Sequence, residues 1–252
     1  MFACSALSRA LTPNEHVHGS GDDAVCRNLA RIAASVCEAW KNVTPRDPSM
    51  QLDQGIIELL LQAAAHPSIS VAGIALRVLP SLISPSNALS IKLLPVLQRR
   101  AITPHHVNAG AVCAVATDAY GVSFQDFHRF REDVLRDALV ACWKANGNGY
   151  MDSCTSAVEE FCGDHATASL SFHLEAALFC IEAAGAVAME HVAGFEQSSQ
   201  LKRCTHALAR KPESLRSNPQ TISRMSSLLQ KVRAPHFARL LETIETLFYL
   251  SY

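Results

Sequence analysis

Two helical stripes separated by a short break, within residues 47–84, constrain the fold more than any other feature of this sequence. In each stripe the apolar residues recur at the spacing that places side chains along one face of an α-helix. The first stripe holds Leu52, Ile56, Leu59, Leu60 and Ala63, and the second holds Val71, Ile74, Ala75, Val78, Leu79 and Leu82. The pattern predicts an antiparallel helical hairpin. Because a single hairpin cannot bury both of its faces, it also predicts neighbouring units of the same kind.

The ends of these two helices carry residues that begin or stop a helix. Asp47 is the predicted N-cap of the first helix, with Pro48 at the first helical position, where a missing N–H group is harmless. Pro67 is predicted to end that helix, because the residue before a proline is driven out of the helical region. Ser68 or Ser70 then caps the second helix. The break between the helices is therefore expected to be short.

Further amphipathic segments extend this arrangement along the chain. Helices are predicted at about residues 22–43, 86–100, 123–143, 150–162, 169–191, 197–209, 219–232 and 235–250, with kinks at Pro80 and Pro95. Residues 1–21 are expected to be irregular, and about 101–123 to be loop-rich. Helix pairs recur at a period of about 40 residues, as in HEAT and armadillo repeats. The predicted fold class is all-α, an α-α superhelix (a HEAT/ARM-type solenoid of antiparallel helix pairs) over residues 22–252.

Three local patterns predict how these helices pack. The buried face of the helix at 22–43 is predicted to hold Val25, Leu29, Ile32, Ala33, Val36 and Trp40. Residues 146–149, with the sequence Asn-Gly-Asn-Gly, are expected to form a turn. The helix at 169–191 is apolar nearly all round, so we expect neighbouring helices to enclose it. Its polar strip is narrow and consists of Glu175, Glu182 and Glu190.

Composition limits the class of protein. Hydrophobic residues make up 49% of the 252 residues, enough for a core, while aromatic residues make up only 6%, which favours closely packed helices. The most apolar run, residues 176–189, is interrupted by Glu182 and is too short to cross a bilayer, so no membrane insertion is expected. The first residues also lack the apolar stretch of a signal peptide. The nine cysteines include no Cys-x-x-Cys pair, which favours free, buried thiols in the cytosol or nucleus.

Charge is unevenly distributed along the chain. The net charge is -1, but residues 201–239 carry nine lysines and arginines against a single acid, Glu213. One interpretation is a patch for an acidic protein partner; the other is a set of ordinary solvated helix faces. No aromatic residue alternates with the basic ones before Phe237, so direct nucleic-acid binding through base stacking is not expected. The leading candidates for the partner-binding patch are Lys202, Arg203, Arg210 and Lys211.

Residues that could carry catalysis or hold a metal are sparse. Cys154, Cys162 and His165 could approach one another, but a zinc site needs four converging ligands and no fourth is evident. The glutamates of the helix at 169–191 are spread too far along it to act as a general acid and base pair. The chain has neither a P-loop nor a dinucleotide-binding glycine motif. The sequence therefore predicts a protein that is not an enzyme and that uses no cofactor.

Five short motifs, taken in order, give the sequence a resemblance to a known family. They are Cys26-Arg27-Asn28, His66-Pro67, Val71 with Ile74, Phe130-Arg131 with Val134 and Asp137, and Glu175-Ala176-Ala177-Leu178-Phe179. In order and spacing this set resembles the central HEAT-repeat portion of the importin-β (karyopherin-β) superfamily of nuclear transport receptors. It is most similar to the transportin-3 and importin-13 branch. The resemblance covers about residues 22–192 and extends more loosely over the rest.

The resemblance implies a nuclear transport receptor-like segment that binds protein cargo, the Ran GTPase or both, with nucleoporins as further partners. It also implies a protein that shuttles between nucleus and cytoplasm. Relatives in that branch carry phosphorylated Arg/Ser-rich cargo, so an acidic or phosphorylated cargo segment is the expected ligand class of the basic patch. The alternative is a HEAT-repeat interaction scaffold with no role in transport.

Overall fold

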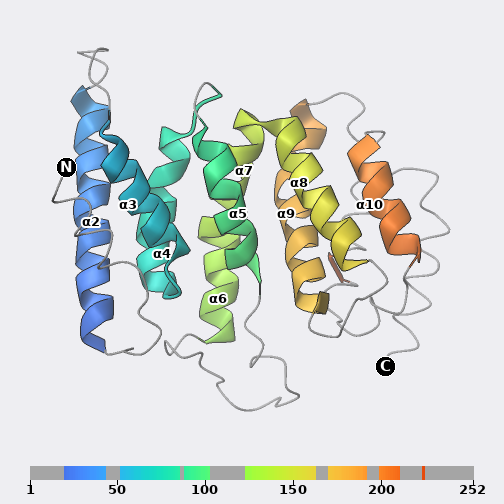
Figure 1. Cartoon of the computed structure of the whole chain (residues 1–252), viewed down its shortest axis with the longest axis horizontal. Helices are drawn as coiled ribbons and strands as arrows, with labels where there is room; N and C mark the ends of the chain where they lie inside the picture. The colour runs from blue at the N-terminus through green and yellow to red at the C-terminus, as the bar shows by residue number, and fades with distance from the viewer. Residues whose placement is uncertain are drawn as a thin grey trace. The chain divides into compact units, whose positions relative to one another are not determined.

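A computed structural model of the chain describes residues 20–43, 52–85, 88–102, 123–162, 170–191, 199–210 and 223–224 (Figure 1). Within these ranges every regular element is a helix and no strand occurs, which confirms the all-α class for the part described. The chain divides into two compact units, Met1–Leu97 with Ala111–Ala141 and Gln98–Gly110 with Cys142–Tyr252. The superhelical arrangement itself stays a prediction.

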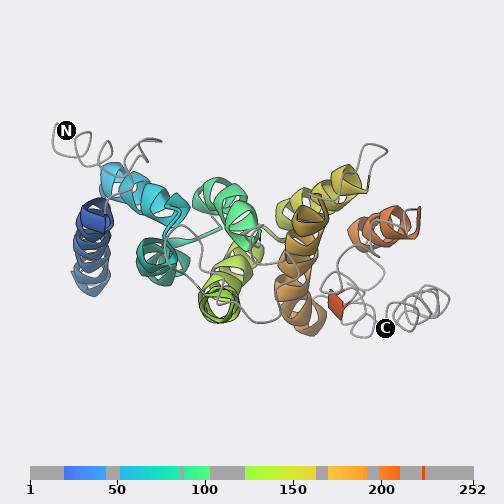
Figure 2. The same cartoon turned by 90° about the horizontal axis from the view of Figure 1, so that it is seen from below.

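Three helices that follow one another in the sequence pack together in the first unit. They are α2 (Ser20–Val43), α3 (Gln54–Ala65) and α4 (Ile69–Val78). Each of the three contacts the other two, and Figure 2 shows α3 and α4 joined by a short corner with α2 beside them. Both predicted stripes contribute to the core: Leu59 and Leu60 of α3 and Val71 and Ala75 of α4 are buried. The helical hairpin predicted from residues 47–84 is therefore confirmed.

The start of α3 differs from the prediction. The helix begins at Gln54, and its N-cap is Asp53, whose carboxylate accepts a hydrogen bond of 2.7 Å from the backbone N–H of Gly55. The prediction that Asp47 caps this helix is therefore wrong. Asp47 itself lies outside the described residues. The cap follows the first residue of the predicted stripe, Leu52, so the helix begins later than its apolar pattern suggests.

The corner between α3 and α4 follows the prediction. His66 ends α3 with a ψ of 136°, an extended conformation imposed by the proline that follows it. Ser68 occupies the N-cap position of α4, although its hydroxyl contacts the Ser70 hydroxyl at 2.9 Å instead of capping the helix. The His66 imidazole Nδ1 accepts a hydrogen bond of 3.2 Å from the Ser68 backbone N–H. This bond holds the buried histidine in the corner.

The buried face of α2 is not the face predicted from hydrophobicity. Of the predicted set, Ala33 is buried, whereas Val25, Ile32 and Val36 are exposed by 52%, 61% and 41%. The side that packs into the unit is made of small residues, namely Cys26, Ala30, Ala33 and Cys37. Small side chains allow neighbouring helices to approach closely, which increases the area of contact between them. The larger contact area can then stabilise the burial of a face that is less apolar than the one left exposed. The predicted buried face of α2 is therefore wrong, and the helix carries an outward-facing apolar stripe.

The elements that follow α4 contain two departures from regular α-helix, and the last residues of two of them, 98–101 and 142–145, belong to the second unit. At Pro80 the helix α4 continues as a 3₁₀ turn, η1 (Leu79–Leu82), which places the irregularity where the proline predicts it. The predicted helix at 123–143 is formed by α6 (Phe124–Phe130), a π-helical turn η3 (Arg131–Leu135) and α7 (Arg136–Ala145). Helix α5 (Leu89–Ala101) contains Pro95 inside it. Both α6 and η3 contact α4, and a Cβ atom at Gly73 of α4 would lie 3.9 Å from the Phe130 ring.

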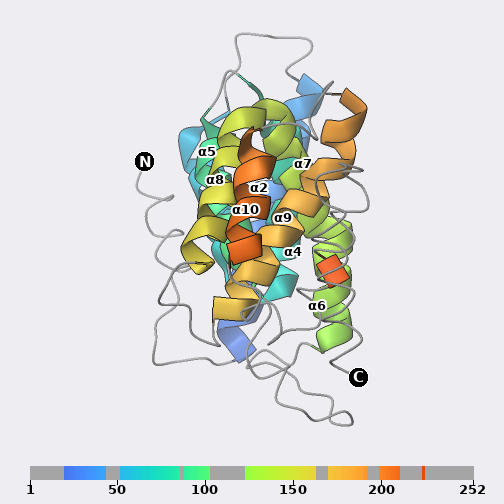
Figure 3. The same cartoon turned by 90° about the vertical axis from the view of Figure 1, so that its right-hand side faces the viewer.

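The second unit is organised around α8 (Gly147–Phe161), which contacts both α9 (Leu170–His191) and α10 (Ser199–Arg210) (Figure 3). The turn predicted at residues 146–149 is wrong, because α8 already begins at Gly147, with Asn146 as its N-cap. Gly149 makes this possible: a Cβ atom there would lie 2.5 Å from the Asn146 side-chain nitrogen, so the missing side chain leaves room for the Asn146 amide. The glycines accommodate a helix start instead of a turn.

Helix α9 is enclosed, as its sequence predicts. Every residue from Leu174 to Gly185 is buried, including the carboxylates of Glu175 and Glu182. The Tyr150 hydroxyl of α8 donates a hydrogen bond of 2.6 Å to the backbone carbonyl of Cys180, which joins the two helices in the core. The predicted helix at 197–209 is observed as α10. The helices predicted at about 219–232 and 235–250 lie outside the described residues, apart from two helical residues at 223–224.

Candidate functional site

The four residues of the predicted basic patch are only partly described by the structure. Lys202 and Arg203 lie on α10 and are exposed. Arg210 is the last residue of that helix, but its side chain is outside what the structure describes, as is the whole of Lys211. The structure therefore places two of the four basic side chains on the exposed face of one helix, and a common patch of all four stays a prediction.

Arg203 already has acidic partners within its own unit. Its guanidinium donates a hydrogen bond of 3.0 Å from Nε to Glu159 Oε1 and lies 3.7 Å from Asp152, both on α8. The hydrogen bond from Arg203 lowers the pKa of Glu159 below its usual value. Salt bridges between exposed side chains contribute little to stability, but they do compensate charge locally. Any attraction of α10 for an acidic partner therefore depends more on Lys202 than on Arg203.

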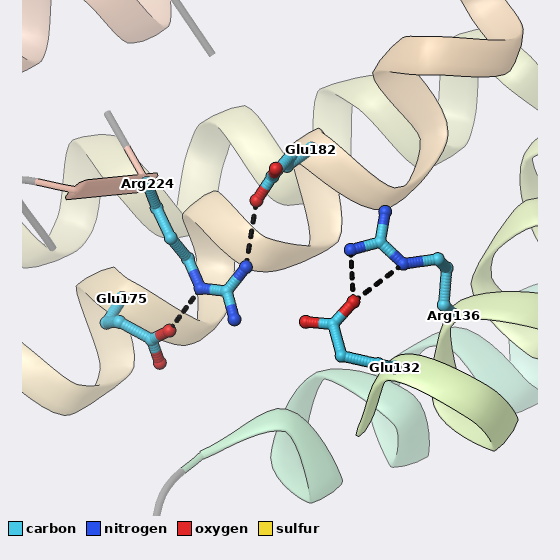
Figure 4. A network of polar contacts seen from close by, with 5 residues as sticks. All are labelled: Glu132, Arg136, Glu175, Glu182 and Arg224. Atoms are coloured by element: carbon cyan, nitrogen blue, oxygen red, sulfur yellow. Dashed lines mark hydrogen bonds and ion pairs between the residues drawn. The ribbon is translucent and has the colours of Figure 1, made fainter. Parts of the chain in front are cut away.

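A second arginine lies in a buried cluster on α9 (Figure 4). Arg224 donates from Nε to Glu175 Oε1 at 2.5 Å and from Nη1 to Glu182 Oε2 at 2.8 Å. Its guanidinium carbon also lies 4.7 Å from the centre of the Phe179 ring. Glu175, Phe179 and Glu182 stand at positions i, i+4 and i+7 of α9, so they share one face of the helix. Together they hold the guanidinium by two carboxylates and an aromatic face.

Burial makes the loss of a partner more costly in the Arg224 cluster than in a surface salt bridge. The side chains of Glu175, Glu182 and Arg224 are exposed by only 1%, 9% and 15%. Burial by itself lowers the pKa of Arg224, but the carboxylate of Glu175, together with that of Glu182, outweighs this effect and raises the pKa. Buried charges are stable only when they are paired, and removal of one partner leaves the others uncompensated. The cluster therefore binds residue 224 to a helix more than forty positions earlier in the chain.

Sequence reasoning missed this cluster. The polar strip of Glu175 and Glu182 is visible in the sequence, but there it predicts only a narrow polar face on an enclosed helix. A signal was present, because two carboxylates two turns apart with an aromatic residue between them form an arginine-binding surface on an otherwise apolar helix. The identity of the arginine could not be deduced, since residues 201–239 offer several basic candidates and only the tertiary structure brings Arg224 to α9.

A cluster of thiols surrounds the Tyr150 hydroxyl in the second unit. Burial raises the pKa of Cys142 to about 12, and burial likewise raises the pKa values of Tyr150 and Cys204. Gln98 contributes a contact of 3.6 Å from Nε2 to the Cys154 sulfur. Thiols with raised pKa values remain protonated at neutral pH and are poor nucleophiles. These residues therefore have the properties of core side chains.

The structure gives no support for a metal site among the residues it describes. Within the described ranges no group of three or more histidine, cysteine, aspartate or glutamate side chains is arranged to hold an ion. Of the three residues considered for zinc, Cys154 and Cys162 are buried free thiols, and His165 is outside the described part. Cys162 lies at the end of α8.

Comparisons of the chain with protein-family models, with curated protein sequences and with solved structures found no match. A search of the described helices for a membrane-spanning segment found none that is long and apolar enough.

Proposed function

We propose that this chain is a nuclear transport receptor-like segment of importin or transportin type, which binds protein cargo, the Ran GTPase or both. The observation that supports the proposal most is the ordered set of five motifs, whose residues lie in helices that α5 and α8 interrupt. They run from α2, through the corner of α3 and α4, to α6 with η3 and then α9. An all-helical chain with helices packed on sequence neighbours is the architecture that such a receptor segment requires.

Most of the motif residues occupy packing positions, although Asn28 and Asp137 are exposed. Cys26 of α2, His66 of the corner, Phe130 of α6 and Phe179 of α9 are all buried. The resemblance is therefore one of helix-to-helix packing, and it supports a shared architecture more directly than a shared partner. Binding to cargo, Ran or nucleoporins is the functional part of the proposal, and it would use exposed side chains such as that of Lys202.

Nucleotide-dependent binding of Ran separates the two functional classes. The purified chain is immobilised and incubated with Ran loaded with GTP or with GDP, and bound Ran is measured. A transport receptor is expected to retain the GTP form in clear excess over the GDP form. Equal retention or none, together with stable binding of other proteins from extract, would favour the alternative, a HEAT-repeat scaffold with no role in transport.

The basic patch is tested separately, because its failure would leave Ran binding untouched. A variant with serine at Lys202, Arg203, Arg210 and Lys211 is compared with the native chain for capture of a phosphorylated Arg/Ser-repeat peptide. Native capture is expected to weaken steeply with salt, because the Debye length falls from about 10 Å at 0.1 M to about 3 Å at 1 M. Equal capture by both proteins would assign these four side chains to ordinary solvated surface.

A further inference from the structure

The contact between α8 and α10 engages all three nitrogens of the Arg203 guanidinium. Nε donates a hydrogen bond of 3.0 Å to Glu159 Oε1, and Nη2 donates one of 2.5 Å to Glu159 Oε2. Nη1 lies 3.7 Å from Asp152 Oδ1. The contact with Glu159 is bidentate, which is the geometry in which an arginine also binds the carboxylate of a partner protein. The groups that would bind an external anion are therefore already occupied by carboxylates of the same chain.

Helix packing holds these carboxylates next to Arg203. Asp152, Thr155 and Glu159 stand at positions i, i+3 and i+7 of α8, so they share one face of the helix. Thr155 is buried on that face, and its hydroxyl donates a hydrogen bond of 3.4 Å to the backbone carbonyl of Gln200 on α10. This face of α8 is therefore the one that packs against α10. The proximity of Arg203 to the two carboxylates follows from the packing of the helices as well as from the ion pair itself.

The ion pair remains open to exchange with an external anion. The Arg203 side chain is exposed by 46%, and those of Asp152 and Glu159 are exposed by 54% and 37%. Exposed ion pairs of this kind contribute little to stability, so an incoming anion can displace Glu159 at a small cost. Lys202, the next candidate of the basic patch, is exposed beside Arg203 on the same helix. An acidic partner that approaches α10 thus meets Lys202 together with an arginine that is held by α8.

We propose that Glu159, assisted by Asp152, is an intramolecular competitor for Arg203, an autoinhibitory contact that lowers the affinity of α10 for an acidic protein partner. This inference rests on the proposed partner-binding patch and concerns the regulation of that patch. Because α8 and α10 belong to one unit, the competitor is present at a high effective concentration that does not depend on the concentration of the protein. The two carboxylates also repel an acidic partner directly.

The test measures the affinity of the full chain for a fluorescently labelled polyglutamate peptide by fluorescence anisotropy at low salt. Glu159→Gln keeps the size of the side chain and removes its charge, so Arg203 loses its bidentate ionic partner. The dissociation constant of this variant is expected to fall about two- to fivefold relative to the native chain, the range that corresponds to one exposed ion pair. Circular dichroism verifies that each variant keeps the helix content of the native chain.

The matched control is Glu160→Gln. Glu160 is the next residue of α8 and is exposed, and its substitution changes the net charge by the same amount, whereas Arg203 bonds to Glu159. A smaller gain in affinity is therefore expected for this control. A second control places Glu159→Gln in an Arg203→Ser background, where no arginine remains to be released. That double variant is expected to bind the peptide no better than Arg203→Ser alone.

Three outcomes contradict the inference. It is overturned if Glu159→Gln binds the peptide no more tightly than Glu160→Gln, or if the gain persists in the Arg203→Ser background. It is equally overturned if none of these proteins binds the peptide, an outcome that also removes the basic patch. Native binding that Lys202→Ser weakens and Glu159→Gln leaves unchanged would overturn the autoinhibitory contact alone, and the patch would stand. Retention of Ran is measured without this peptide, so the transport proposal is judged separately.

Discussion

Arg224 shows how much one residue can contribute when its partners are buried. Its two glutamate partners and the Phe179 ring lie on a helix whose middle section has no exposed residue. The contrast with Arg203 is useful, because that arginine also contacts two carboxylates but lies at the surface. Arg203 and Arg224 each contact two carboxylates, but only Arg224 is largely buried. The two arginines are therefore expected to differ in how much their removal destabilises the protein.

We expect Arg224→Ala to lower the free energy of unfolding by about 3–5 kcal/mol, because two buried carboxylates lose their counter-charge. Urea denaturation followed by circular dichroism measures the change, with Arg203→Ala as the exposed control, for which only a minor shift is expected. Adding Glu175→Gln to Arg224→Ala should recover part of the loss, since a neutral amide is easier to bury than a lone carboxylate. An Arg224→Ala protein as stable as the Arg203→Ala protein would contradict the cluster.

At the scale of the element, the sequence predicts the C-terminal end of α3 correctly, but it predicts neither the N-cap of α3 nor the buried face of α2. The proline at residue 67 ended α3 where expected, because its effect is local and steric. The predicted N-cap, Asp47, is wrong, because Asp53 is an equally good capping residue and lies next to the first residue of the helix, Gln54. The face of α2 was also assigned wrongly, because its Cys/Ala side forms the closer contact with α3 and α4.

The capping role of Asp53 leads to a prediction for α3. Asp53→Ala removes the acceptor of the Gly55 N–H and should destabilise the protein by about 0.5–2 kcal/mol. Asp53→Asn keeps an acceptor and should be close to native, which separates capping from a loss of charge. Thermal unfolding of the three proteins provides the measurement. If the alanine and asparagine variants are equally unstable, the hydrogen bond is not the source of the effect.

At the scale of the whole molecule, helices contact mainly those near them in the sequence. In the first unit α2, α3 and α4 pack together, and in the second α8 packs with α9 and α10. Where stability is a sum over neighbouring elements, damage in one region has limited effect on distant regions. Arg224, which reaches back to α9 from a position beyond α10, is an exception in sequence distance, although it stays within its own unit.

This local pattern predicts a confined response to Arg224→Ala in hydrogen exchange. Backbone amides of α9 are expected to lose protection, with smaller losses in α8, because α9 packs on α8. Amides of α2, α3 and α4 should exchange at the native rate, since they belong to the other unit. Mass spectrometry of peptides after exchange gives the comparison. A uniform loss of protection across both units would instead show that the chain unfolds as one cooperative body.

Sequence alone determined those features that depend on neighbours along the chain. The helical class, the hairpin of α3 and α4, the corner at His66 and the enclosed character of α9 all follow from spacing, proline chemistry and side-chain polarity within about twenty residues. The tertiary structure decided which face of α2 is buried, which carboxylates bind Arg203, and that Arg224 pairs with Glu175 and Glu182. Those outcomes depend on close approach between distant segments, because packing area and charge pairing are properties of both partners at once.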